Sequence, residues 1–137
     1  MRILGIDYGD ARTGLSISDP SGFLAGSPSV IHEWNYAKLV DKLVAFIQEN
    51  KIEEIVLGHP KNMDGTEGDR CAIVKEFMAE VKKAYPDVEV FFWDERLSTV
   101  AATRSLIEAD VSRRKRKKVI DKMAAVFILQ GFLDSKR

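Results

Sequence analysis

The segment ILGIDYGDARTGLSIS, residues 3–18, decides the fold because it contains two short apolar runs on either side of a polar turn. Residues 3–8 and 13–18 have the composition of strands, and Gly9 and Asp10 between them favour a tight connection. We therefore predict that the sheet begins with an antiparallel hairpin.

The rest of the chain alternates strand and helix patterns. After the turn at residues 19–22 we expect a third antiparallel strand over residues 23–31. Apolar residues recur at three- and four-residue steps and predict helices at residues 36–50 and 73–85, whereas short apolar runs predict buried parallel strands at 55–57 and 88–93. Further helices are predicted after Ser98, which can act as a cap, and from about Val119 to Leu133.

This order predicts one α/β domain over residues 1–137. The sheet is expected to be mixed and five-stranded, an antiparallel meander plus two parallel strands, with helices on both faces. A length of 137 residues is typical of one domain, and no apolar run approaches the roughly 20 residues that span a bilayer. With no export leader in the first residues, we expect a soluble protein of the cytoplasm that does not contact membranes.

The lone cysteine, Cys71, cannot form an internal disulfide or a cysteine metal site. It lies beside Ala72 and Ile73 in a predicted helix, which is typical of a packed thiol without a function.

Charge is unevenly distributed, although 21 basic and 21 acidic side chains balance formally. Six basic residues in a row leave the rest of the chain with more acids than bases. This arrangement predicts a local contact with a polyanion. The segment either tracks a phosphate backbone or is a charged connector that keeps the last helix soluble. Its members are Arg113, Arg114, Lys115, Arg116, Lys117 and Lys118.

Asp7 is unusual because it occurs inside a strand that is apolar on both faces, where an isolated buried carboxylate would be costly. It either caps the following turn or binds a metal. Asp94 and Glu95 stand at the end of a second apolar run, and alternation sends their side chains to opposite faces, so only one can join Asp7. The other interpretation is a pair of solvated charges at a strand end.

Asp121 favours the metal interpretation, because the residues three, four, seven and eight positions later are apolar and share its helix face. If Asp7, Glu95 and Asp121 converge, their charges repel one another unless a cation lies between them. Oxygen ligands suit Mg²⁺ or Mn²⁺, and paired ions at such sites serve phosphodiester hydrolysis. Asp7, Glu95 and the sequence at 58–60 also follow strand ends, where ligands bind in open α/β sheets.

Several other residues are candidates for nucleic-acid binding. Arg12 and Arg96 either clamp a phosphate, which guanidinium groups match geometrically, or pair with a neighbouring acid. The polar loop at 61–68, which contains Lys61 and Asn62, either closes over substrate or is an ordinary surface loop. Three aromatic side chains are candidates for base stacking, although apolar spacing favours core positions for two of them, Tyr36 and Trp93. The third is Trp34.

Four motifs together resemble the YqgF (or RuvX) family of Holliday junction resolvase-like proteins over essentially the whole chain. They are GIDYG at 5–9 with Arg12 and Gly14, GHP at 58–60 leading into NMDGTEG at 62–68, DERLST at 94–99, and DKMAA at 121–125. The resemblance implies a ribonuclease H-like fold, with Asp7, Glu95 and Asp121 as the catalytic, metal-binding carboxylates. It also implies processing of the 5′ end of precursor 16S ribosomal RNA, and hence a role in ribosome biogenesis, by a monomer or weak homodimer.

Two positions depart from related proteins. Resolvases of the RuvC type usually carry a second acid three residues after the last one, and here that position is Ala124. This difference argues against cleavage of branched DNA, which remains the alternative function. His59 stands where relatives often have an apolar residue, and it is either a packing residue or an added phosphate contact.

Two other classes of function are compatible with parts of the sequence. The segment from Asp7 to Gly14 resembles the first phosphate hairpin of ATP-binding proteins of the actin and sugar-kinase type, but 137 residues supply only one of their two lobes. A nucleic-acid-binding module without catalysis is the other class. The presence of Asp7, Glu95 and Asp121 argues against it.

Overall fold

The computed structural model describes residues 2–60, 64–94, 104 and 106–136, with the backbone alone at 120 and 121. The named elements in chain order are β1 (Ile3–Asp7), β2 (Arg12–Ile17), β3 (Ser29–His32), α1 (Tyr36–Glu49), β4 (Glu54–His59), α2 (Asp69–Ala84), β5 (Glu89–Asp94) and α4 (Arg113–Ser135).

The strands form one sheet in the order β3-β2-β1-β4-β5. The β1–β2 and β2–β3 pairs are antiparallel, whereas β4 runs parallel to both β1 and β5. The predicted meander plus two parallel strands is confirmed. Because β1 and β4 are central and packed on both faces, their carboxyl ends are held in fixed positions at one edge of the sheet.

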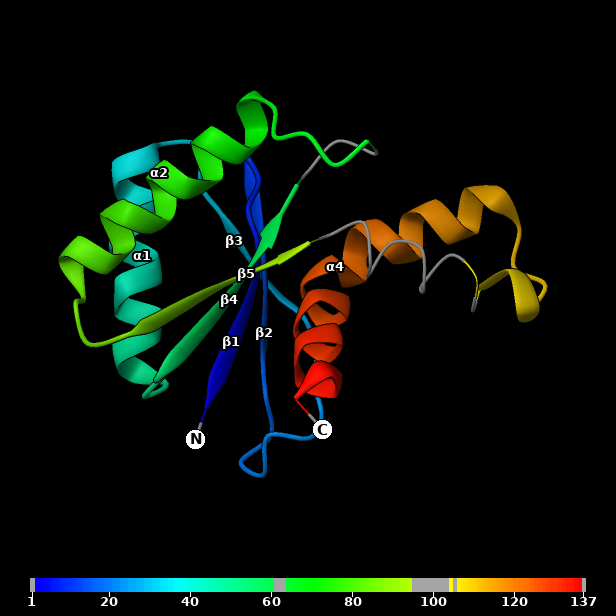
Figure 1. The fold of residues 1–137 in the computed structure, drawn as a ribbon, viewed down its shortest axis with the longest axis horizontal. Coiled ribbons are helices and arrows are strands. Elements are labelled where there is room, and N and C mark those ends of the chain that lie inside the picture. Colours follow the sequence, from blue (N-terminus) through cyan, green and yellow to red (C-terminus); the bar gives the residue numbers. More distant parts are fainter. Residues whose placement is uncertain (1, 61–63, 95–103, 105, 137) are drawn as a thin grey trace.

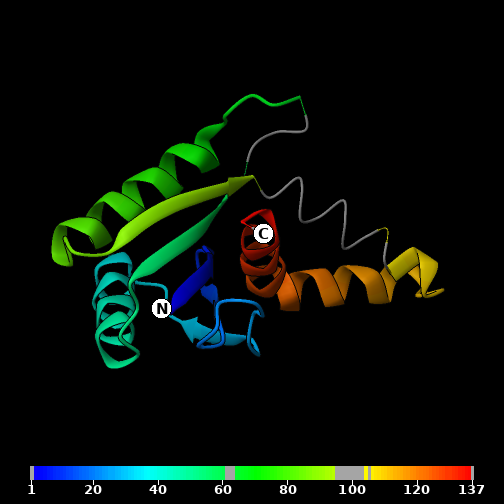
Figure 2. The ribbon, with the colours of Figure 1, turned by 60° about the horizontal axis from the view of Figure 1, so that its bottom comes forward.

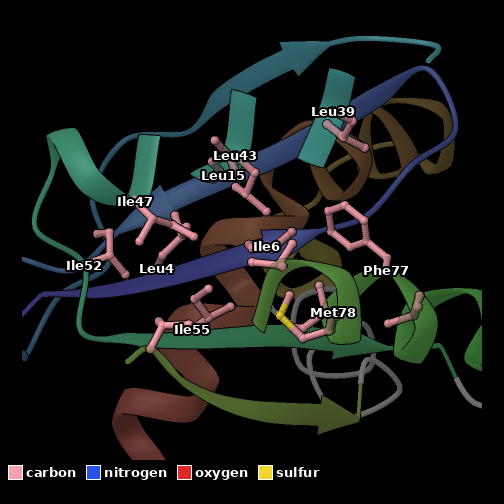
Figure 3. Packing of buried hydrophobic residues seen from close by; sticks show 14 residues of the cluster. Leu4, Ile6, Leu15, Leu39, Leu43, Ile47, Ile52, Ile55, Phe77 and Met78 are labelled. Carbon is pink, nitrogen blue, oxygen red and sulfur yellow. The ribbon is translucent and has the colours of Figure 1, made fainter. Parts of the chain in front are cut away.

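Helices cover both faces of the sheet, as predicted. Helices α1 and α2 lie on one face and α4 lies on the other (Figure 1 and Figure 2). The larger core cluster packs Leu4, Ile6 and Leu15 of the sheet against α1 and α2 (Figure 3). A smaller cluster packs Ile3 and Val56 against the second half of α4.

Local sequence explains where α1 begins and which face it buries. The side chain of Asn35 accepts a hydrogen bond from the backbone N of Lys38 at 3.0 Å, which satisfies one free amide of the first turn. Leu39, Leu43 and Ile47 then follow at helical spacing and are buried. Among the helices in the described residues, none has the length and apolar character needed to cross a bilayer.

The predicted third strand is wrong in its first half. Strand β3 covers only Ser29–His32, and residues 19–26 form a turn with a single bridge between Ser18 and Ala25. The Asp19 carboxylate accepts hydrogen bonds from the backbone N of Phe23 at 2.8 Å and of Leu24 at 3.0 Å, and such local bonds compete with strand pairing. Together with a hydrogen bond from Ser21, they lower the pKa of Asp19 to about 2.

Two predicted helix starts are corrected. Helix α2 begins at Asp69, before the first apolar residue of its pattern. Helix α4 begins at Arg113 and so contains the whole basic segment, because the Ser112 hydroxyl accepts from the backbone N of Lys115 at 3.4 Å. The connector interpretation of this segment is therefore wrong. The helix predicted after Ser98 falls largely outside the described residues, of which 104 and 106–108 are helical.

Helix α4 approaches β1 closely at Gly5. A Cβ atom added there would lie 2.7 Å from Cβ of Leu129 and 2.9 Å from the backbone O of Ala125. Real Cβ atoms do not come so near, so the absence of a side chain allows α4 to pack directly on the central strand.

We expect Gly5→Ala to destabilise the protein by about 1–3 kcal/mol, because the added methyl group must push α4 away from β1. The measurement is the free energy of unfolding in urea. Gly14→Ala is the matched control, since its Cβ would meet Cβ of Ala125 at 3.6 Å and Cβ of Asp7 at 3.7 Å, which are ordinary contacts. Equal losses in the two variants would contradict the close approach at Gly5.

Candidate metal and nucleic-acid site at the carboxyl edge of the sheet

Strands β1, β4 and β5 end together, at Asp7, His59 and Asp94. In the parallel register Ile6 lies beside Leu57, and His59 lies beside Asp94. The three strand ends therefore lie at one edge of the sheet, as the sequence predicted.

Asp7 lies on the face of the sheet that α4 covers. It pairs with Gly14 of β2, and a Cβ atom at Gly14 would lie 3.7 Å from Cβ of Asp7 and 3.6 Å from Cβ of Ala125 in α4. Asp7 is half-buried at this position. A half-buried carboxylate at a strand end offers an oxygen ligand of the kind that Mg²⁺ and Mn²⁺ prefer.

Of the two acids at the end of β5, Asp94 lies within the described residues. Trp93 packs on the face of α4, where its ring meets Phe132 at a centroid distance of 6.5 Å. Asp94, the next residue in the strand, therefore lies on the face opposite Asp7. Glu95 follows it and lies outside the described residues.

Asp121 belongs to α4, one helical turn before Ala125. Leu129 of α4 lies near Gly5, and Ala125, one turn earlier in the helix, lies near Gly14, which pairs with Asp7. Toward its start, α4 thus contacts positions progressively closer to the carboxyl end of β1. The backbone of the next turn, which contains Asp121, thus continues toward the carboxyl edge. The side chain of Asp121 is outside the described part of the structure.

Arg12 is the basic candidate on the same face as Asp7. It is the first residue of β2, two positions before Gly14, so the pleat directs it to the α4 face, and it is exposed. Arg12 forms no ion pair with another described residue. The described part of the structure therefore does not support the alternative that Arg12 pairs with a neighbouring acid. The other arginine of the predicted clamp, Arg96, and the loop residues Lys61 and Asn62 lie outside the described residues.

The basic segment forms the first turns of α4, which run away from the sheet (Figure 2). All six side chains are exposed except Arg116, which is half-buried and donates from Nη1 to the backbone O of Val111 at 2.9 Å. A helix that carries several exposed cations can follow a phosphate backbone.

The aromatic candidates divide only in part as the apolar spacing indicated. Trp93 is partly buried against α4, as predicted. The core position predicted for Tyr36 is wrong, since this residue is 39% exposed, although its ring packs edge-on against Phe77 at a centroid distance of 6.0 Å. Trp34, in contrast, is 83% exposed, in the connection that follows β3. Of the three, Trp34 is the most exposed and thus the best placed to stack on a base.

Arg70 is a residue of this edge that the sequence analysis missed. From the first turn of α2 its guanidinium donates to Oδ1 of Asp10 at 3.0 Å and to the backbone O of Tyr8 at 3.1 Å, and it lies over the Tyr8 ring. Burial, followed by the nearby Asp10 charge, raises the pKa of Tyr8. Arg70 thus ties α2 to the hairpin that begins directly after Asp7. No spacing in the sequence connects residues 8 and 70.

Arg70→Lys is expected to lower the free energy of unfolding by about 1 kcal/mol, because a single ammonium cannot reproduce the two-pronged contact with Asp10 and Tyr8. Urea unfolding measures the change. The control is Arg113→Lys, at an exposed position of α4. If the two variants unfold at the same urea concentration, Arg70 does not hold the hairpin.

The strand order β3-β2-β1-β4-β5, with α1 and α2 on one face and α4 on the other (Figure 1), is that of the ribonuclease H-like fold. Among solved structures, the fold is similar to Thermus thermophilus RuvC in complex with a Holliday junction substrate. The TM-score is 0.62 at 13% identity, over 99% of this chain and 95% of that one.

Sequence comparison gives the family. The family model described as "RuvX: Holliday junction resolvase" matches residues 1–135, and the chain belongs to this family. Relatives from Desulforamulus reducens and Clostridioides difficile are 51% and 52% identical over 135 residues, covering 98% of this chain and 98% and 95% of their own. Both bear the name "Putative pre-16S rRNA nuclease". The protein is accordingly a nuclease, a hydrolase of phosphodiester bonds.

Proposed function

We propose that this protein is a metal-dependent nuclease that cleaves RNA during maturation of the 5′ end of precursor 16S ribosomal RNA in the cytoplasm. The proposal is supported by relatives that are about 50% identical over nearly their whole length and are named as nucleases of precursor 16S ribosomal RNA. The structural observation that carries the proposal is the half-buried Asp7 at the end of the central strand, beneath the closely packed α4.

In this proposal Asp7, Glu95 and Asp121 together hold Mg²⁺ or Mn²⁺. Asp7 supplies an oxygen ligand of the hard type these ions prefer, on the face covered by α4. Since Asp94 lies on the other face, Glu95 is the acid of the pair that alternation directs toward Asp7. The turn of α4 that contains Asp121 is the next one toward this edge after Ala125.

The divalent ions, when bound, supply Lewis-acid stabilisation of the phosphate and of the leaving oxygen. The chain provides the arrangement of the reacting groups. Strand pairing on both sides of β1 fixes the Asp7 backbone, and the exposed Arg12 on the same face can hold a phosphate oxygen next to it. Binding energy gained along the RNA by the basic turns of α4 then positions the scissile bond.

Cleavage of branched DNA is the second candidate function, because the description of the matching family names a Holliday junction resolvase. The position three residues after Asp121 is Ala124, which offers no fourth carboxylate. This difference from RuvC-type resolvases favours RNA.

Asp7→Asn, Glu95→Gln and Asp121→Asn should each reduce Mg²⁺- or Mn²⁺-dependent cleavage of a precursor 16S RNA fragment by about 100-fold or more, because each removes one charge that stabilises the bound ions. Gel-based cleavage of RNA and of a four-way DNA junction is measured in parallel. EDTA should abolish both the wild-type activity and any residual activity.

Asp41→Asn serves as the matched control, since Asp41 is an exposed acid of α1 on the other face of the sheet. Wild-type cleavage by any of the three site variants would remove that residue from the site. Cleavage of the junction without cleavage of RNA would replace the proposed function with resolution of branched DNA.

The basic segment is expected to contribute affinity without sequence preference. The slope of log affinity against log salt is negative for a protein that binds single-stranded RNA. Lys115→Gln combined with Lys118→Gln should make it less steep by about 1–2, because each lost phosphate contact removes roughly 0.7 from its magnitude. Glutamine keeps the helix propensity of lysine. The measurement is fluorescence anisotropy with labelled RNA at several salt concentrations.

Lys38→Gln combined with Lys83→Gln is the control double variant, with the same loss of charge at exposed positions of α1 and α2. If the slope becomes less steep by the same amount in both double variants, net charge alone sets the affinity, and no particular contact with α4 does.

A further inference from the structure

Three residues with metal-ligand side chains meet beside the carboxyl end of β4. His59 is the last residue of β4, Glu67 precedes α2, and Cys71 is in the first turn of α2. Their ligand atoms all lie within 4.8 Å of one another. His59 and Cys71 are 5% and 1% exposed, so the cluster is closed on the side of the core.

The cluster is separate from the candidate nuclease site. His59 lies on the same face as Leu57, which belongs to the core under α1 and α2, because residues two apart in a strand share a face. Asp7 lies on the face covered by α4. The two groups thus occupy opposite faces of the same sheet edge.

His59 has a ring nitrogen left over. Its Nε2 atom contacts Oε1 of Glu67 at 2.6 Å, whereas its buried Nδ1 atom has no hydrogen-bond partner among the described residues. Leaving a buried polar atom unsatisfied costs roughly 1–3 kcal/mol. Its edge-on contact with Phe92, at 5.4 Å between ring centroids, fits the packing interpretation of His59 but does not satisfy the nitrogen. Because Nε2 is the ring nitrogen that faces Glu67, it is the atom that an ion shared with Glu67 would use.

Two neighbouring side chains favour the ionised form of Glu67. Lys75 donates to the same Oε1 atom at 2.7 Å, and the hydrogen bonds from Lys75 and then from His59 lower the pKa of Glu67. Its side chain is 45% exposed, which gives an ion a path to the cluster from solvent.

We propose that His59, Glu67 and Cys71 bind a divalent transition-metal ion of the zinc type. A nitrogen, a thiolate sulfur and a carboxylate oxygen together suit Zn²⁺, which takes four tetrahedral ligands, whereas Mg²⁺ prefers oxygen alone. Water completes the fourth position. The Cys71 thiol loses its proton to solvent on binding, so affinity rises with pH.

The adjustment needed for binding is small. Zinc bonds of about 2.0–2.3 Å in a tetrahedron place ligand atoms roughly 3.3–3.6 Å apart. A pair at the 4.8 Å limit of the cluster would close by about 1 Å, and Nε2 of His59 and Oε1 of Glu67, now 2.6 Å apart, would open by somewhat less than that. Glu67 can make this movement because it is half-exposed and lies in the connection before α2. Lys75, whose side chain is 51% exposed, can turn into solvent when the ion replaces it as the partner of Glu67.

The bound ion would fasten the connection before α2 to the end of β4. The first turn of α2 also carries Arg70, which contacts the hairpin after Asp7. Binding of the ion would therefore stabilise the sheet edge from the face opposite the nuclease site. This role does not rest on the proposed RNA cleavage.

Titration of the purified protein with Co²⁺ tests the site. Cys71 is the only cysteine in the chain, so a near-ultraviolet thiolate-to-cobalt charge-transfer band can arise from no other side chain. In excess Mg²⁺, which keeps the proposed carboxylate site occupied, we expect the band to saturate at one Co²⁺ per chain and to be displaced by Zn²⁺. Cys71→Ala should abolish it, and His59→Leu should weaken Co²⁺ binding by about 10-fold or more.

Glu67→Gln is a second ligand variant that should fold normally, since the side chain of Glu67 is half-exposed. It should likewise weaken Co²⁺ binding by about 10-fold or more. Glu76→Gln, at an exposed position of α2, and Asp7→Asn should leave the band unchanged. Circular dichroism checks the fold of each variant. Absence of the band in the wild-type protein, or an affinity for Co²⁺ that neither His59→Leu nor Glu67→Gln changes, would overturn the proposal.

Discussion

The close contact between α4 and β1 at Gly5 is the constraint on which the rest of the structure depends. Because no side chain separates them, the helix backbone packs on the central strand, and its successive turns meet Gly5 and then the level of Asp7. One packing contact thus fixes the second face of the core and the approach of the turn containing Asp121 to the end of β1. The proposed convergence of acids far apart in sequence depends on that contact.

The carboxyl edge of the sheet has two chemically different faces. On the α4 face lie the carboxylate of Asp7 and the exposed guanidinium of Arg12, the two described side chains of the proposed nuclease site. On the other face, His59 and Cys71 are buried next to Glu67, a set with nitrogen and sulfur donors. The pleat produces this separation, because consecutive residues at the strand ends point to opposite sides. Hard and softer ions could therefore occupy the same edge without competing for ligands.

Much of the fold was predictable because hydrophobic periodicity reports directly on burial. The stripe of Leu39, Leu43 and Ile47 gave α1, and the apolar runs gave the central strands. The errors came where local polar bonds outweigh periodicity: Asp19 organises a turn within the expected third strand, and Ser112 caps α4 ahead of its apolar residues. Of the site, Asp7 was recognisable as an acid in an apolar strand. Arg70 was not, because its partners Tyr8 and Asp10 are distant in sequence.

By itself the sequence determined the element types, the mixed sheet and the family, since these follow from residue patterns within short segments. Only the tertiary structure decided which face of the sheet each strand-end residue occupies, how closely α4 approaches β1, and that His59 lies beside Glu67 and Cys71. The reason is physical. Periodicity is a property of neighbours along the chain, whereas register and close packing depend on atoms brought together by folding.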